Sequence, residues 1–137
     1  MVRPILLDTC ALLWVVNKGG ISEGAEAALA DADSAGADIL ISPISAWEIG
    51  QLVSRGRLAL ALEPRDWFQS ALNSGLRLAA MPPEVLVASS FLPGERLRDP
   101  ADRILAATAR AYRYRLMTRD RPILAFGADG HLDALAC

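Results

Sequence analysis

Five carboxylates fall at sequence positions that a parallel sheet would bring together. Each stands where an apolar segment ends or where a predicted helix begins, and they are Asp8, Glu48, Asp99, Asp102 and Asp120. In open α/β sheets, ligands bind beyond the carboxyl ends of the strands. We therefore expect these acids to line one site.

Crowded carboxylates stay ionised together only when a cation compensates their charge. A set of oxygen ligands with no neighbouring His or Cys favours Mg²⁺ or Mn²⁺ over zinc or copper. Such ions activate water and stabilise the charge that develops on a phosphate. The pattern therefore predicts metal-dependent hydrolysis of a phosphodiester.

Each acid also has a local structural explanation. Glu48 matches the last position of a capping box that begins at Ser45 and opens a helix. The four aspartates stand where this residue type commonly caps a helix or a turn. On the pattern alone, the shared site and the separate caps are equally supported.

Several other chemistries lack their residues. His131 is the sole histidine, so a mechanism that needs two histidines within one chain is excluded. The sequence contains no phosphate-binding glycine loop, no nucleophile elbow and no zinc-ligand spacing. Cys10 and Cys137 are expected to be reduced thiols without a functional role.

Composition indicates one globular domain over residues 1–137. Hydrophobic residues make up 53% of the chain and charged residues 22%. The longest apolar runs are too short for a membrane span, and Asp8 interrupts the N-terminal one where a signal peptide would need apolar residues. We therefore expect a cytoplasmic protein that is not in a membrane.

The net charge of −2 alone argues against nucleic-acid binding, because such domains are commonly basic. However, 13 of the 14 basic residues are arginine, whose planar guanidinium suits phosphate. The net charge therefore does not exclude a ligand that contains phosphate.

Alternating strands and helices must position these residues. Strands are predicted at 2–7, 38–42, 76–81 and 116–118. Helices are predicted at 9–17, 23–32, 45–54, 64–72, 83–91 and 101–114. The alternation predicts an α/β fold with a central, mainly parallel sheet.

Four segments of the sequence resemble the motifs of the PIN-domain family, and within it the VapC-type toxins. They run from Ile5 to Trp14, from Ile41 to Ile49, from Arg98 to Ala109 and from Leu116 to Asp120. Their order is that of the family, and together they span nearly the whole chain. The resemblance implies a parallel sheet of about five short strands between helices.

The resemblance also implies an activity and partners. Asp8, Glu48, Asp102 and Asp120 match the metal-binding catalytic acids, and Asp99 matches an additional acid of the subgroup. The implied reaction is RNA hydrolysis with Mg²⁺ or Mn²⁺. The implied partners are a second toxin copy in a homodimer and a cognate antitoxin whose C-terminal segment lies across the active-site groove.

Other side chains near these acids are candidates for RNA contact. They are the hydroxyls of Thr9 and Thr118 and the guanidinium groups of Arg98, Arg103, Arg119 and Arg121. For the arginines, ordinary solvated surface is the alternative, and for Thr118 the alternative is a residue that only ends its strand. Leu97 departs from the subgroup, because many relatives have His there.

Two rival functions use the same fold or the same acids. A PIN-fold module that binds RNA or protein without cutting is the first, and intact acids argue against it. A metal-dependent phosphatase or DNA nuclease is the second.

Replacing Asp8 or Asp102 with alanine is expected to abolish cleavage and to leave the chain folded. The three tryptophans, each within a predicted helix, are expected to pack in the core, and an apolar groove for the antitoxin is the alternative for Trp14.

Overall fold

Five strands form one sheet in which every neighbouring pair is parallel. The computed structural model describes residues 2–137, and within them the strand order is β3-β2-β1-β4-β5. The strands are β1 (Ile5–Leu7), β2 (Ile39–Ile41), β3 (Arg77–Leu78), β4 (Arg115–Thr118) and β5 (Asp133–Ala136). β1 lies at the centre, where Leu6 pairs with Leu40 of β2 and Leu116 of β4. The predicted α/β fold with a parallel sheet is confirmed.

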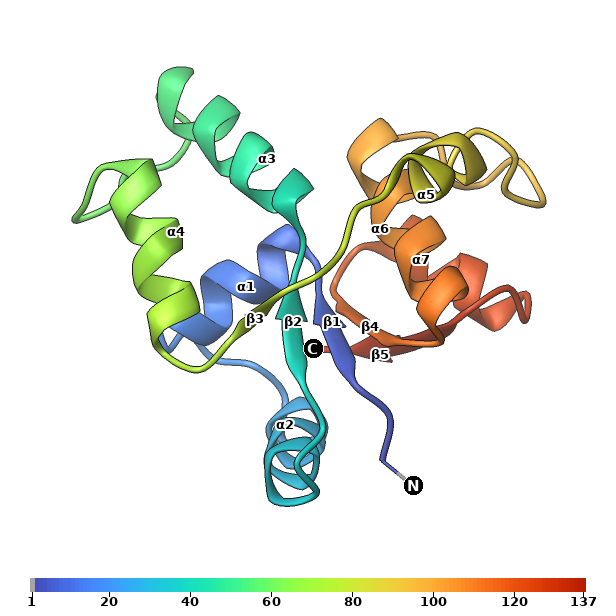
Figure 1. Cartoon of the computed structure of the whole chain (residues 1–137), viewed down its shortest axis with the longest axis horizontal. Helices are drawn as coiled ribbons and strands as arrows, with labels where there is room; N and C mark the ends of the chain where they lie inside the picture. The colour runs from blue at the N-terminus through green and yellow to red at the C-terminus, as the bar shows by residue number, and fades with distance from the viewer. Residues whose placement is uncertain (1) are drawn as a thin grey trace.

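Helices connect these strands and lie on both sides of the sheet (Figure 1). They are α1 (Thr9–Val16), α2 (Glu23–Ser34), α3 (Pro43–Ser54), α4 (Pro64–Asn73), α5 (Pro83–Ala88), α6 (Pro100–Tyr112) and α7 (Arg121–Ala128). The last five have proline in the first turn, where a missing N–H leaves no helical hydrogen bond unmade. Among the described residues, no helix is long and apolar enough to cross a membrane.

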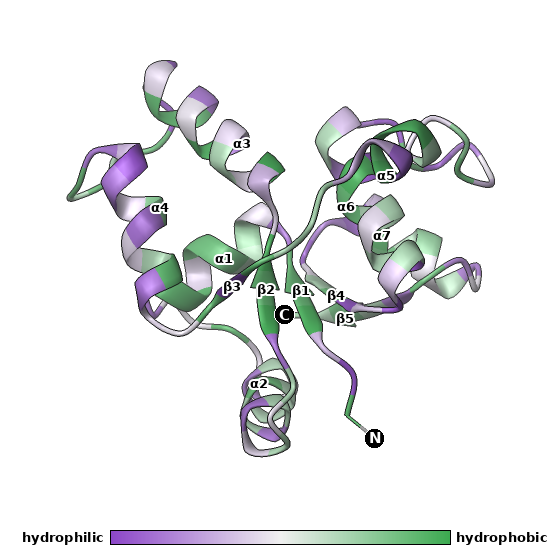
Figure 2. Cartoon of the chain, in the orientation of Figure 1, coloured by the Kyte–Doolittle hydropathy of each residue, from purple (hydrophilic) through white to green (hydrophobic). Residues whose placement is uncertain are grey.

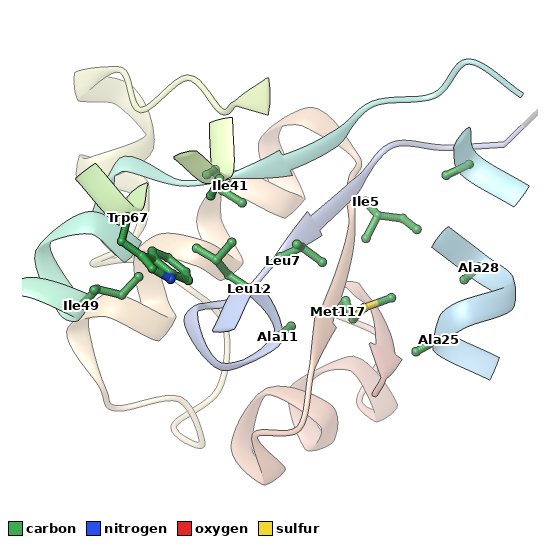
Figure 3. Packing of buried hydrophobic residues seen from close by; sticks show 12 residues of the cluster. Ile5, Leu7, Ala11, Leu12, Ala25, Ala28, Ile41, Ile49, Trp67 and Met117 are labelled. Carbon is green, nitrogen blue, oxygen red and sulfur yellow. The ribbon is translucent and has the colours of Figure 1, made fainter. Parts of the chain in front are cut away.

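Both faces of the central strands β1, β2 and β4 are largely buried, whereas both residues of β3 are exposed. Figure 2 shows that β1 and β2 are hydrophobic. Successive residues of a strand point to opposite faces, so Ile5 and Leu7 join one core cluster and Leu6 joins the other. Trp67 of α4 packs beside Leu12 in the first cluster (Figure 3). Because the faces are filled, a site between these elements must lie at an edge of the sheet.

Strands β1, β2 and β3 are shorter than predicted, whereas β4 begins one residue earlier than predicted. Pro4 lacks an N–H and cannot donate to a neighbouring strand, so β1 begins at Ile5 instead of at residue 2. β5 lies in a segment that the sequence pattern did not assign, and it pairs with β4 through all four of its residues. The core placement is confirmed for Trp67 but wrong for Trp14 and Trp47, whose side chains are 39% and 59% exposed.

Candidate active site

All five predicted acids line one pocket at the carboxyl ends of the strands. The pocket has a volume of about 340 Å³, and its other lining residues are Thr9, Cys10, Leu13, Leu52 and Arg119. The acids come from separate parts of the chain, namely the start of α1, the body of α3 and the starts of α6 and α7. The expected convergence is therefore present in the structure.

Asp8 anchors the site where β1 passes into α1. Its side chain is only 4% exposed and caps α1, with Oδ1 accepting from the backbone N of Ala11 at 2.7 Å. Oδ2 accepts from the hydroxyl of Thr118 at 2.5 Å. Both carboxylate oxygens are thus held by donors, and this fixes the orientation of Asp8.

Thr118, at the end of β4, links two of the acids. It is fully buried, donates to Asp8 and accepts from the backbone N of Asp120 at 2.9 Å. Asp120 in turn caps α7 by accepting from the backbone N of Ile123 at 3.0 Å. The hydroxyl of Thr118 is thus occupied by these two contacts, and its expected contact with RNA stays a prediction.

Glu48 is not part of a capping box. Helix α3 begins at Pro43, three residues before Ala46, where a box capped by Ser45 would start it. Ser42 caps the helix by accepting from the N of Ile44 at 3.1 Å. Ser45 therefore lies inside the helix, one turn before Glu48 and on the same face. The structural explanation offered for Glu48 from the sequence is wrong, and this acid is free to serve the pocket.

Thr9 holds Glu48 from the first turn of α1. Its hydroxyl donates to Oε1 of Glu48 at 2.5 Å and lies 2.9 Å from the hydroxyl of buried Ser45. Thr9 lines the pocket but is itself buried, so its main contact is with the acid. Ser45 was missed as a site residue, although its three-residue spacing from Glu48 is a helix-face spacing.

The start of α6 contributes two acids. Asp99 caps the helix by accepting from the backbone N of Asp102 at 3.0 Å, as its sequence position predicted. Burial and, after it, the negative charges of Asp99, Asp120, Glu48 and Asp8 raise the pKa of Asp102 to about 8. This is the largest effect of the shared pocket on any one acid.

Burial also raises the pKa of Asp8 and of Glu48, against the hydrogen bonds from Thr118 and Thr9, which lower it. Three acids that resist ionisation in one pocket are a site in which a cation would be favourable. Within residues 2–137 no three acidic side chains lie close enough together to hold a metal ion as they stand. The carboxylates that line the pocket would therefore have to move toward an ion to bind it. An all-oxygen donor set fits Mg²⁺ or Mn²⁺.

The four candidate arginines occupy different environments. Arg119 lines the acidic pocket, whereas Arg98 and Arg121 line a neighbouring shallow depression. Arg103 donates to the carbonyls of Ser89 at 2.8 Å and Leu97 at 2.5 Å. Arg103 thus holds the segment before α6 in place, and its expected role in RNA contact is not supported by this position.

The structure places Leu97 in the core and Cys10 at the pocket. Leu97 is 2% exposed and belongs to the second core cluster, so its departure from the subgroup fills the core instead of altering the pocket. Cys10 was assigned no role but lies at the pocket, next to Thr9. Burial and the neighbouring carboxylates Asp8 and Glu48 raise the pKa of its thiol, which therefore stays protonated and unreactive.

Thr118→Val is expected to weaken Mn²⁺ binding about 10- to 100-fold, because the residue that orients a ligand is lost. Isothermal titration of the metal-free protein with Mn²⁺ measures this. Thr108→Val is the matched control, since Thr108 is equally buried but donates only to Ile104 of its own helix at 2.8 Å. An equal loss of Mn²⁺ affinity in both variants would contradict the role of Thr118.

Carboxylates gathered at the carboxyl edge of a parallel sheet place this chain among α/β proteins whose ligand site lies at that edge. The chain belongs to the PIN-domain family, whose model matches residues 5–127. It is 32% identical over 121 residues to "Ribonuclease VapC22" of Mycobacterium tuberculosis (strain ATCC 25618 / H37Rv), covering 88% of this chain and 89% of that protein.

Solved structures share the fold at lower identity. The VapBC2 structure from Rickettsia felis, bound to a promoter DNA fragment, contains a chain with a TM-score of 0.65 and 18% identity, covering 97% of this chain and 98% of that one. The FitAcB structure from Neisseria gonorrhoeae contains one with a TM-score of 0.54 and 21% identity, covering 96% of each. At these identities the likeness shows the fold.

Proposed function

We propose that this chain is a metal-dependent endoribonuclease of the VapC type and the toxin of a toxin–antitoxin pair. The observation that carries the proposal is the pocket in which five carboxylates converge at the carboxyl edge of the sheet. The relation to VapC22, which is named a ribonuclease, supports RNA as the substrate. Together they favour catalysis over binding alone.

Asp8 and Asp102 would hold the ion, with Glu48, Asp120 and Asp99 completing the set. When bound, Mg²⁺ or Mn²⁺ supplies positive charge for the phosphate and acidity for the attacking water. The raised pKa of Asp102 means that this residue must release a proton before it can bind the ion.

Neighbouring residues favour the ionised form of two of these carboxylates and surround them with positive charge. Thr118 donates to Asp8 and Thr9 donates to Glu48, and each hydrogen bond favours the ionised form of its acid. Arg98, Arg119 and Arg121 lie around the acids and would contact phosphates of the RNA on either side of the cleaved bond. The acids thus carry the reaction while the arginines position the strand.

The proposed partners are a cognate antitoxin and a second copy of the chain. Two of the similar structures are described as VapBC2 and FitAcB, names that each join two components. An antitoxin segment that covered the acidic pocket would exclude both the cation and the RNA. We propose that the chain acts in the cytoplasm as a homodimer.

Cleavage of an end-labelled RNA pool by the purified chain tests the proposal. We expect cleavage with Mg²⁺ or Mn²⁺, none with EDTA, and none of single-stranded DNA or a phosphomonoester under the same conditions. RNA binding without cleavage would instead favour a binding module. Cleavage of DNA or release of phosphate would favour the second rival, because carboxylate-bound ions alone do not distinguish ribose from deoxyribose.

A further inference from the structure

Arg119 is held in place more firmly than an exposed arginine usually is. Its guanidinium carbon lies 4.3 Å from the centre of the Trp14 ring, and its Nη2 donates to the carbonyl of Gly20. The residues on either side are buried Thr118 and the α7 cap Asp120. Both ends of the Arg119 side chain are thus fixed, which removes much of the entropy that a free arginine loses on binding.

The loop after α1 closes against Trp14. The N–H of Gly19 donates to the carbonyl of Trp14 at 2.8 Å, and a Cβ at Gly19 would lie 1.9 Å from Cε3 of the Trp14 ring. Only glycine allows this approach. One side of the indole therefore packs on Gly19 and Arg119 covers the ring, so the exposed Trp14 has a defined task in holding Arg119.

This contact keeps a positive charge beside the acids without neutralising them. Arg119 is the one basic side chain among the described residues that line the acidic pocket. Within residues 2–137 it forms no ion pair of 4.0 Å or less, although five carboxylates line the same pocket. An unrestrained guanidinium would be drawn onto those carboxylates, where it would compete with a divalent ion.

We propose that Arg119 binds a phosphate of the RNA next to the cleaved bond, and that Trp14 and Gly19 are positioning residues that hold it at the pocket mouth. The inference rests on the proposed function. It predicts that the ring of Trp14 matters only through Arg119. The anionic ligand is one backbone phosphate, which a planar guanidinium can grip with two parallel hydrogen bonds.

RNA binding is measured by fluorescence anisotropy between about 50 and 200 mM salt, in an Asp102→Asn background that is expected not to cleave. In this background, Arg119→Gln is expected to weaken binding roughly threefold to tenfold and to lower the salt slope by about 1, as for the loss of one phosphate contact. Arg65→Gln is the matched control, because Arg65 is 95% exposed, lies on α4 and is absent from the pocket lining. It is expected to leave the slope unchanged.

Three further variants separate positioning from simple structural support. Trp14→Leu keeps apolar bulk but loses the aromatic face, and Gly19→Ala displaces the ring, so both are expected to lower the salt slope as Arg119→Gln does. Trp14→Phe restores most of it. Combining Trp14→Leu with Arg119→Gln is expected to add little, because the two residues act as one unit.

Unfolding curves of each variant test whether the fold is retained. An unchanged slope in Arg119→Gln, or additive losses in the double variant, would overturn the inference even where the wild-type chain cleaves RNA. A wild-type chain that neither binds nor cleaves RNA would instead overturn the proposed function, and the inference with it.

Discussion

Asp8→Asn is expected to reduce metal-dependent RNA cleavage by more than about 100-fold while leaving the chain folded, since even outer-shell substitutions cost 10- to 100-fold. The carboxylate is lost, but an amide oxygen can still accept from the N of Ala11 and cap α1. Removing a charge from a crowded acidic pocket also relieves repulsion, which partly offsets the altered contact with Thr118.

Asp8→Ala is expected to lose cleavage and stability together. It removes the cap of α1 and leaves the buried hydroxyl of Thr118 without its acceptor, at a combined cost of roughly 2–3 kcal/mol. The structure therefore adds a loss of stability to the expected loss of cleavage in this variant. Urea unfolding and the RNA cleavage assay measure the two effects, and equal stability of Asp8→Ala and Asp8→Asn would contradict the capping role.

Raising the pH of the metal-free protein is expected to lower its melting temperature, and Asp102→Asn is expected to weaken this dependence. The pKa of Asp102 is about 8 in the folded chain, against an ordinary value of 3.8. From about pH 4 to about pH 8, the unfolded chain has released a proton that the folded chain retains, so the free energy of unfolding falls as pH rises. The amide side chain of the Asp102→Asn variant cannot ionise, so this contribution is absent from it.

Thermal scans in EDTA at about pH 5 and pH 8 measure the effect. At the higher pH, the melting temperature of Asp102→Asn is expected to lie on the order of 5 °C above that of the wild type. The difference is smaller than the full pKa shift would give, because solvent screens the charge of a partly exposed group. Saturating Mn²⁺ should reverse the order, since the ion stabilises the wild-type carboxylate and finds one ligand fewer in the variant. A wild type that gains stability between pH 5 and 8 in EDTA would exclude a raised pKa at Asp102.

The α/β order and the parallel sheet could be predicted because they depend on local signals. Apolar runs ending at acids and prolines in first turns mark strands and helix starts. The lengths of the first three strands were overestimated, because apolar character does not reveal which N–H groups find a partner, as at Pro4. β5 was missed because its four residues, Asp133–Ala136, lack the β-branched and aromatic side chains that mark a strand.

The acids of the site could also be predicted, because the chain order of strands places them at one edge. The contacts that hold these acids in place could not be predicted. The contact between Thr118 and Asp8 joins residues 110 positions apart, and no local pattern predicts such a pair. Likewise, the Ser45 and Glu48 spacing fits both a capping box and a helix face, and only the start of α3 at Pro43 distinguishes them.

Three of the five acids are helix caps, which bears on how the chain can be supplied with metal. Asp8, Asp99 and Asp120 each accept from a backbone N–H at the start of α1, α6 or α7. The positive ends of these helices offset part of the acidic charge before any ion arrives. We therefore expect folding without the ion, unlike in zinc fingers. The concentration of Mg²⁺ or Mn²⁺ would then govern how active each molecule is, while the amount of folded protein follows its synthesis and degradation.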